Sequence, residues 1–424
     1  MKCFVYIVLP CMLTMYTGPT SAGEKADIIV SASGGGDFTS IQAALDMVES
    51  RQPKPVVILI RNGIYDEKIY IRRSHISLVG EDRDSTRIAF AELRENWNND
   101  HGGSDWGAGV VNIDTGTTDI TLANLTVYNN YGWQHGVFNK HEFAIRGAGT
   151  RIMLLYCNVI SDGGDALSLW NKRDGMYYHA GCSFEGWVDF VCPRGWCYIT
   201  NSTFFAHNRP SAAIWHDGSG DKNQKFVIRD SYFDGVPGFP LGRNHLDARF
   251  YLIDCRFSER MADRPFYRPP SSPREWQWGD RHYFFHCHRD GGDFAWFGDN
   301  LGTAEGSPRE SDITARWTFD GKWDPEASMP EILPFAAFPD PKDGATEVSS
   351  RKVTLRWVSG RNGVTHLVRL GIAGSPGSVV VTENHAVEIQ DLKSAMRYCW
   401  SVDEVTETDT VRGKIWTFRT AGDR

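Results

Sequence analysis

The apolar and polar positions from residue 119 onward repeat one short pattern. Each repeat is a β-rich run that ends in Asn, Asp or Cys and is followed by glycine or polar turn residues. The last residues of successive runs are 33, 25, 19, 29, 25 and 32 positions apart. Repeats of about 20–50 residues indicate a solenoid, a propeller or a tandem array. The runs are Ile120–Asn124, Ile152–Cys157, Met176–Cys182, Cys197–Asn201, Phe226–Asp230, Phe250–Cys255 and Tyr283–Cys287.

The repeats contain strands without an intervening helical pattern, and their lengths vary in the turns. This favours an all-β fold, a right-handed parallel β-helix in which each coil buries its inward side chains on the next. A β-propeller is the competing fold, but it needs about four strands per 40–50 residues with tight hairpins, and few hairpin signals occur. Asn and Cys at one recurring position predict an internal ladder, so Cys157, Cys182 and Cys255 are expected to be buried thiols.

Upstream of the repeats, residues 38–48 have apolar side chains at helical spacing. Ile41, Ala44, Leu45 and Val48 share one face, which predicts a helix that caps the N-terminal end of the solenoid. The first strands are expected at 56–60, 68–71 and 76–79, and residues 91–109 are expected to form a polar, aromatic loop.

The pattern changes near residues 338–344. Short alternating strands follow, which predict a small β-sandwich that resembles a fibronectin type III module. We therefore expect a β-helix domain over residues 23–335 and a sandwich over 336–424 with a structural role. The expected strands of the sandwich are Val353–Trp357, Val379–Val381, Tyr398–Val402 and Ile415–Phe418.

The first 22 residues predict a secretory signal peptide. Lys2 precedes a short apolar run, and the small residues Thr20, Ser21 and Ala22 follow it. The run is too short to span a bilayer comfortably, so a secreted or periplasmic location is expected, with a lipid anchor at Cys11 as the less favoured alternative.

The charge and the cysteine content of the chain limit the kinds of partner and covalent cross-link that are expected. The 424 residues carry 45 Lys and Arg against 53 Asp and Glu, a net charge of -8, which disfavours nucleic acid or an anionic membrane as a partner. Seven cysteines follow residue 22, an odd number that argues against a complete disulfide framework. A local Cys192–Cys197 disulfide is an open alternative. No metal site is expected, and the protein is expected to be a monomer.

Several segments resemble motifs of a known family. The weaker matches are Gly36–Ala44, Val57–Tyr65 and Ile76–Glu81, which other β-helix polysaccharide enzymes share. Sharper matches are Gly164-Asp-Ala-Leu167, Gly186-Trp-Val-Asp-Phe190 and Leu241-Gly-Arg243. They resemble the Gln-Asp-Thr-Leu, Gly-x-Val-Asp-Phe and Leu-Gly-Arg-Pro-Trp segments of the pectin methylesterases, carbohydrate esterase family 8. The resemblance spans about residues 27–325, and these motifs occur in the family's order.

The resemblance implies Asp189 as the nucleophile, Asp165 as the general acid/base and Arg243 as the residue that orients the nucleophile. Such chemistry needs one ionised carboxylate for attack and a second, protonated carboxyl group for the departing methoxide. Arg243 beside Asp189 would favour its charged form. The two aspartates are 24 residues apart, about one coil, so adjacent coils could bring them together. Asp162 is an alternative to Asp165.

The chain departs from the family at its oxyanion site and at its substrate walls. The family has two glutamines near the developing oxyanion, and Gly164 and His141 occupy those positions here. Losing one oxyanion donor can cost about 10²–10³ in rate, so His141 and another donor must replace the glutamines or the chemistry is impaired. Asn244-His245 stands where the family has a tryptophan. The candidate substrate-binding residues are Trp187, Trp215, His216 and His245.

Three functions remain open. The leading hypothesis is an exported, cofactor-free esterase that removes methyl groups from galacturonate residues of pectin, with a branched or decorated region as the expected substrate. The second is a non-catalytic β-helix that binds pectic oligosaccharides, which the missing glutamines and the 15 tryptophans favour. The third is a lyase or glycosidase on the same scaffold, which ranks last because no calcium-ligand carboxylate cluster is evident.

Overall fold

The computed structural model describes residues 26–49, 54–372 and 377–422. The chain divides into two compact units. One extends from Ala26 to Ala337 and includes Val358–Gly360, and the other comprises the remaining residues from Phe338 onward. The expected signal peptide lies outside the described residues. No helix among the described residues is long and apolar enough to cross a membrane.

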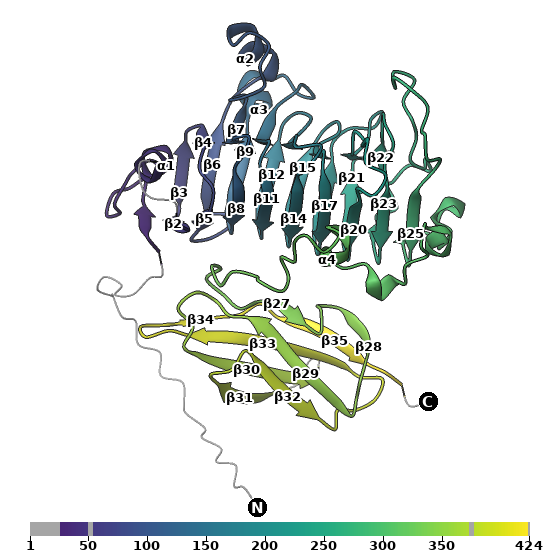
Figure 1. The fold of residues 1–424 in the computed structure, drawn as a ribbon. Helices are drawn as coiled ribbons and strands as arrows, with labels where there is room; N and C mark the ends of the chain where they lie inside the picture. Colours follow the sequence, from purple (N-terminus) through teal and green to yellow (C-terminus); the bar gives the residue numbers. More distant parts are fainter. Residues whose placement is uncertain (1–25, 50–53, 373–376, 423–424) are drawn as a thin grey trace, which may run out of the picture. The chain divides into compact units, whose positions relative to one another are not determined.

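Three parallel sheets form the first unit (Figure 1). The ten-stranded sheet contains β1 Ile28–Val30, β2 Val56–Ile60, β5 Ile76–Gly80, β8 Thr118–Ala123, β11 Thr150–Leu155, β14 Met176–Ala180, β17 Trp196–Thr200, β20 Phe226–Arg229, β23 Phe250–Ile253 and β25 His282–Phe285. The nine-stranded sheet contains β3 Gly63–Asp66, β6 Thr86–Phe90, β9 Thr126–Asn129, β12 Asn158–Ser161, β15 Ser183–Gly186, β18 Thr203–Ala206, β21 Tyr232–Gly235, β24 Arg256–Phe257 and β26 His288–Arg289. The seven-stranded sheet contains β4 Ile69–Ile71, β7 Gly109–Ile113, β10 Phe143–Gly147, β13 Leu167–Leu169, β16 Val191–Pro193, β19 Ile214–Trp215 and β22 Gly242–Arg243.

Each strand pairs with the equivalent strand of the next coil. Ile152 of β11, for example, lies opposite Ile120 of β8 and Tyr177 of β14. Because the pairs are in register, inward side chains stack on one another and form one continuous apolar core. The predicted parallel β-helix is confirmed.

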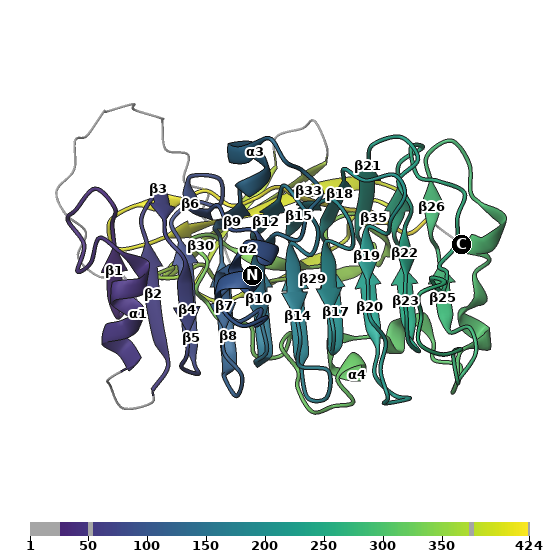
Figure 2. The same ribbon diagram turned by 90° about the horizontal axis from the view of Figure 1, so that it is seen from above.

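Helix α1 (Ile41–Glu49) lies at the N-terminal end of this stack, beside β1 and β2 (Figures 1 and 2). Its buried residues are Ile41, Ala44, Leu45 and Val48, the face that the sequence predicts. The carboxylate of Glu67 accepts hydrogen bonds from the first two backbone N–H groups of the helix, at 2.8 and 3.1 Å. Glu67 therefore caps the helix from another segment, and the predicted capping helix is confirmed.

The recurring Asn, Asp and Cys residues occupy two adjacent positions in each coil, so they form two ladders rather than the single internal ladder that the sequence predicts. The first ladder has a positive φ angle at the corner after each strand of the ten-stranded sheet from β8 onward, which Asn and Gly tolerate well. The next residue points inward, and the Cys157 thiol, for example, donates to the Leu122 carbonyl at 3.3 Å. The corner positions are Asn124, Tyr156, Gly181, Asn201, Asp230, Asp254 and His286. The inward positions include Cys157, Cys182, Ser202, Ser231, Cys255 and Cys287.

The remaining helices of this unit are short. They are α2 Arg94–Asp100, α3 Tyr131–His135, α4 Ala315–Thr318 and the 3₁₀ turns η1 Ala295–Phe297, η2 Asn300–Thr303 and η3 Glu310–Asp312. Helix α2 corrects the expectation of a loop over residues 91–109. It buries none of its residues, so it has no apolar face and leaves no periodic signal in the sequence.

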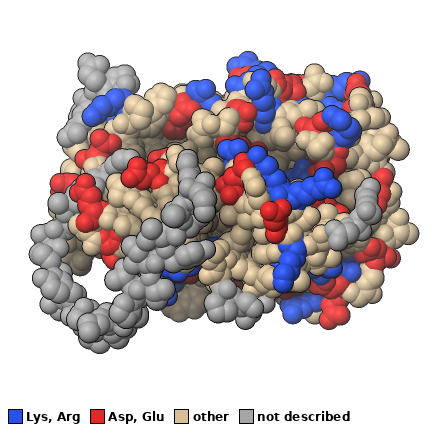
Figure 3. All heavy atoms as spheres, turned by 90° about the horizontal axis from the view of Figure 1, so that it is seen from below, with Lys and Arg blue, Asp and Glu red and all other residues tan. Residues whose placement is uncertain are grey.

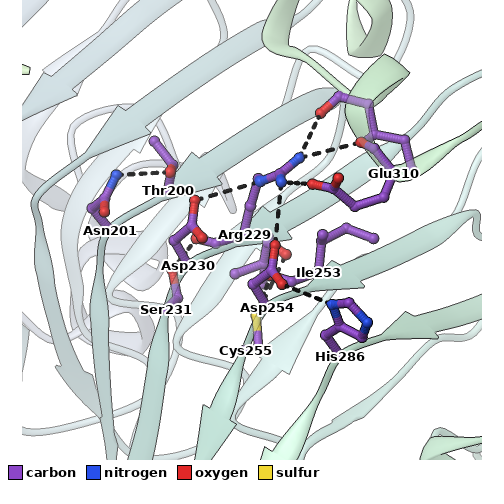
Figure 4. A network of polar contacts seen from close by, with 12 residues as sticks. Thr200, Asn201, Arg229, Asp230, Ser231, Ile253, Asp254, Cys255, His286 and Glu310 are labelled. Atoms are coloured by element: carbon purple, nitrogen blue, oxygen red, sulfur yellow. Dashed lines mark hydrogen bonds and ion pairs between the residues drawn. The ribbon is translucent and has the colours of Figure 1, made fainter. Parts of the chain in front are cut away.

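Arg229 connects the segment after the last coil to the ten-stranded sheet through ion pairs (Figure 4). Arg229 of β20 ion-pairs with Asp230 at 3.4 Å, with Asp254 of the next coil at 3.2 Å and with Glu310 of η3. It also donates to the Glu310 carbonyl at 3.3 Å. Three carboxylates around one guanidinium therefore hold η3 against β20.

The second unit has two sheets. One contains β27 Ala337–Asp340, β29 Lys352–Val358 and β32 Ala386–Gln390. The other contains β28 Ala345–Val348, β30 Thr365–Ile372, β31 Ser378–Thr382, β33 Arg397–Val405, β34 Thr410–Val411 and β35 Trp416–Thr420. Alternate side chains of β29 and β35 are buried, including Leu355 and Phe418, and β33 has a longer buried run that includes Trp400. The likeness to a fibronectin type III module remains a prediction.

Charged side chains of both signs are interspersed on the surface drawn in Figure 3.

Candidate active site

Asp189 lies in the turn before β16 on the seven-stranded side of the β-helix. Its φ angle is +46°, and its backbone N–H donates to the Ala212 carbonyl at 2.7 Å. The residue is 5% exposed. Arg243 of β22, two coils further along, donates from Nη2 to Oδ2 at 2.5 Å and from Nε to Oδ1 at 3.2 Å. This two-point contact fixes the orientation of the carboxyl group.

Burial and Arg243 act in opposite directions on Asp189. Burial raises its pKa to about 7, although the hydrogen bond and charge of Arg243 lower it. Asp165 raises this pKa further, and Arg194 lowers it. Arg243 therefore favours the charged form of Asp189, as expected, but loss of water around the carboxylate is the larger effect on its pKa.

Asp165 occupies the equivalent turn one coil earlier. Its φ angle is +59°, and its backbone N–H donates to the Val188 carbonyl at 3.1 Å, so the two aspartates follow each other on adjacent coils. The thiol of Cys192 contacts both turns, 2.9 Å from Oδ1 of Asp165 and 2.7 Å from the carbonyl oxygen of Asp189. Asp165 is partly exposed.

Asp162, the alternative to Asp165, is engaged elsewhere. Its carboxylate accepts from the hydroxyl of Tyr128 at 3.0 and 3.1 Å and from the backbone N–H of Trp133 at 2.7 Å. It therefore holds the start of α3 against the nine-stranded sheet, which favours Asp165 as the partner of Asp189.

The structure corrects Gly164 as an oxyanion donor. Its N–H donates to the Lys140 carbonyl at 2.6 Å and is not free. A Cβ atom added here would lie 2.6 Å from the carbonyl oxygen of Val188, so this backbone has no room for a glutamine. His141 lies on the neighbouring coil, bridged to Gly164. Its ring is exposed, and Nδ1 lies 2.6 Å from a carboxylate oxygen of Glu95. A donor role for His141 stays a prediction.

A stack of arginine and tryptophan side chains lies on the outer face of the seven-stranded sheet, and the sequence analysis did not find it. The guanidinium of Arg194 lies 3.7 Å from the ring centre of Trp170 and 4.2 Å from that of Trp215. That of Arg146 lies 4.5 Å from Trp170. Nε of Arg194 is 3.2 Å from Asp217, and its buried Nη1 has no hydrogen-bond partner among the described residues. Arg194 thus supplies a positive charge beside Asp189.

The four candidate substrate-binding residues separate into different environments. Trp187 packs against His207 and Phe138, with ring centres 5.6 and 5.8 Å apart. Trp215 meets His245 edge to face at 5.0 Å, and both line a cavity of about 370 Å³ with Lys172 and Asp217, among others.

His216 is corrected as a substrate-binding residue. It is buried, and both ring nitrogens are used, one 3.0 Å from the Gly195 carbonyl and the other accepting from the Gly218 N–H at 3.0 Å. Burial lowers the pKa of His216 to about 4. The ring is therefore neutral near pH 7, and its hydrogen bonds hold two loops together instead of contacting substrate.

The cysteines resolve the disulfide alternative. Cys192 and Cys197 are both buried free thiols, because they belong to different sheets, β16 and β17. No cluster of three or more His, Cys, Asp or Glu residues in the described ranges could hold a metal ion.

Comparison with known proteins agrees with this fold. The family model described as Pectinesterase matches residues 27–234, a range that includes Asp165 and Asp189 but ends before Arg243. Pectinesterase A from Dickeya dadantii is 28% identical over 247 residues, which cover 52% of this chain and 65% of that protein. A probable pectinesterase/pectinesterase inhibitor from Arabidopsis thaliana is 25% identical over 236 residues, covering 52% of this chain and 37% of that protein.

Solved structures show the same fold. A pectin methylesterase from carrot superposes with a TM-score of 0.57 at 17% identity, covering 73% of this chain and 98% of that one. The pectin methylesterase PemA from Erwinia chrysanthemi superposes with a TM-score of 0.56 at 17% identity, covering 72% and 99%.

The chain spans less than two thirds of the length of the first curated relatives it matches, namely 37%, 47% and 60%. The match to the family model, the shared β-helix and the sequence relatives nevertheless agree. Residues 27–234 of this chain match the family model of the pectinesterases, and the chain shares the β-helix fold of the pectin methylesterases.

Proposed function

We propose that the protein is an esterase that hydrolyses methyl esters of galacturonate residues in pectin. The observation that carries this proposal is the two-point contact of Arg243 with Asp189, one coil from Asp165. A solved pectin methylesterase of the same fold has been captured in complex with a hexasaccharide, which supports a pectic oligosaccharide as the substrate class.

The proposed reaction has two steps. The ionised carboxylate of Asp189 attacks the ester carbonyl carbon, the bond to methoxide breaks, and Asp165 gives methoxide its proton to form methanol. Asp165 then takes a proton from water, which hydrolyses the acyl-enzyme and releases the galacturonate and Asp189. No cofactor is needed. The cation of Arg194 and the ring of His141 are the groups that could stabilise the oxyanion in place of the two missing glutamines.

Methanol release from methyl-esterified pectic oligosaccharides tests the role of Asp165. Asp165→Asn should reduce turnover at least a hundredfold, since a general acid/base contributes about 10²–10⁴. Asp162→Asn is the matched control, because Asp162 lies three residues away but bonds to Tyr128 and Trp133. The assignment fails if Asp162→Asn is the more damaging change.

A non-catalytic pectin-binding protein is the second candidate. The packing at Gly164, which excludes a glutamine side chain, is the observation that favours it. This candidate predicts binding of pectic oligosaccharides by the wild type without methanol, across both simple and branched pectins.

We further propose that the protein is exported after removal of residues 1–22 and that residues 336–424 act as a fibronectin type III-like spacer. The curated relatives are pectinesterases, whose polymeric substrate lies outside the cell. N-terminal sequencing of the mature protein tests the cleavage site, and an N-terminus at Met1 would contradict it.

A further inference from the structure

Asp165 has a single side-chain hydrogen-bond partner in the described part of the chain, the thiol of Cys192. Sγ lies 2.9 Å from Oδ1 of Asp165. Asp189, in contrast, is held at both oxygens by Arg243. The orientation of the second aspartate therefore depends on one sulfur atom.

The local fold explains why the thiol points there. Side chains alternate along β16, and Val191 belongs to the apolar core. Cys192 therefore faces the outer side of the sheet, where it pairs in register with Ser168 of the preceding coil. Gly164, beside Asp165, carries no side chain that could supply a donor.

The thiol is suited to donate rather than to react. Cys192 is fully buried, and burial together with the nearby carboxylate of Asp165 holds its pKa well above the usual range. It stays a neutral S–H group, which can donate a hydrogen bond but is a poor nucleophile. The Asp189 carbonyl oxygen, 2.7 Å from Sγ, is a second acceptor in the turn that carries the nucleophile. The single S–H proton can go to only one of the two oxygens, and the carboxylate of Asp165 is the stronger acceptor.

We propose that Cys192 is a positioning residue that donates its S–H to Oδ1 of Asp165 and leaves Oδ2 to exchange a proton with the substrate. This inference rests on the proposed acid/base role of Asp165. Cys192 neither gains nor loses a proton in the reaction. The proton that forms methanol leaves Oδ2 of Asp165, and the proton from water returns to it.

Two variants of Cys192 and one control test the inference in the full-length protein. Cys192→Ala should lower kcat by about threefold to tenfold, the effect of one neutral hydrogen bond, with KM unchanged. Cys192→Ser keeps a donor and should restore kcat. Cys197→Ser is the control, since Cys197 is equally buried but lies in the ten-stranded sheet. A loss that serine does not restore, or a rise in KM that accounts for the loss of kcat/KM, overturns the inference.

A measurement without substrate separates this inference from the proposed function. The Raman S–H stretching band of Cys192 is isolated as the difference between wild type and Cys192→Ser. Asp165→Ala should move that band to higher wavenumber, because the carboxylate is lost and the carbonyl oxygen of Asp189 that remains is a weaker acceptor. A band that does not move contradicts the positioning role even in an active enzyme. A band that moves in a protein that releases no methanol leaves the contact standing and rejects the esterase.

Discussion

Arg243 contacts both carboxylate oxygens of Asp189 across 54 positions of sequence, with donor–acceptor distances of 2.5 and 3.2 Å. Two coils of the β-helix lie between these residues in the chain, and the parallel register of β16, β19 and β22 brings them together. The contact therefore depends on the stacking of the coils. It fixes the direction of the proposed nucleophile and lowers its pKa against the effect of burial.

Arg243→Gln should lower kcat/KM by about tenfold to a hundredfold, the effect of losing a charged hydrogen bond. The remaining activity should require higher pH, because Arg243 lowers the pKa of Asp189 and its removal lets that pKa rise. Initial rates of methanol release across a pH series measure both effects. A uniform loss at every pH would show that Arg243 does not control the charge of Asp189.

The wild-type enzyme should lose activity as the pH falls below about 7. The pKa of Asp189 is raised to about 7, so the carboxylate is protonated below that value and cannot attack the ester. In the acidic range kcat/KM should fall roughly tenfold per pH unit. Full activity retained at pH 5 would contradict the burial of Asp189 that the structure shows.

Arg194→Gln should shift this acidic limb in the same direction as Arg243→Gln, but by less. Arg194 lowers the pKa of Asp189 through its charge alone, whereas Arg243 also donates hydrogen bonds. The glutamine variant also loses the cation between Trp170 and Trp215, so its thermal unfolding should occur at lower temperature. Comparing the pH profiles of the two variants gives the order, and a larger shift in Arg194→Gln would reverse the assignment.

Gly164→Ala should destabilise the β-helix by about 1–3 kcal/mol, the usual effect of overpacking, because its Cβ would lie 2.6 Å from the Val188 carbonyl oxygen. Gly220→Ala is the matched control, since a Cβ there meets nothing within 4 Å. Urea unfolding of both variants measures the difference. Equal stability would mean that position 164 can accept a side chain and that the family's glutamine could be restored.

Local patterns predicted part of this structure well. The buried face of α1 follows from the helical spacing of apolar residues within nine positions. The repeat of strands follows from the apolar residues that recur in every coil. Helix α2 was missed because none of its residues is buried. The sequence pattern did not separate the corner ladder from the inward ladder. Their positions, such as Tyr156 and Cys157, are adjacent in the chain, and the runs that contain them differ in length.

The site required information that spacing does not contain. Asp165, Asp189 and Arg243 were identified through the family resemblance, and the structure then brought Arg243 to Asp189. The stack of Arg146, Trp170, Arg194 and Trp215 was missed because its members come from four successive coils whose connecting loops differ in length. His216 was misassigned because a sequence does not show which way a histidine points.

The role of Asp189 is tested most directly by methanol release from methyl-esterified pectic oligosaccharides by the wild type and by Asp189→Asn, with oligosaccharide binding measured in parallel. The asparagine keeps the size of the side chain but cannot form the acyl-enzyme. We expect turnover by the wild type, no detectable methanol from the variant and retained binding in both. Turnover by Asp189→Asn at a rate near that of the wild type would contradict nucleophilic attack by Asp189.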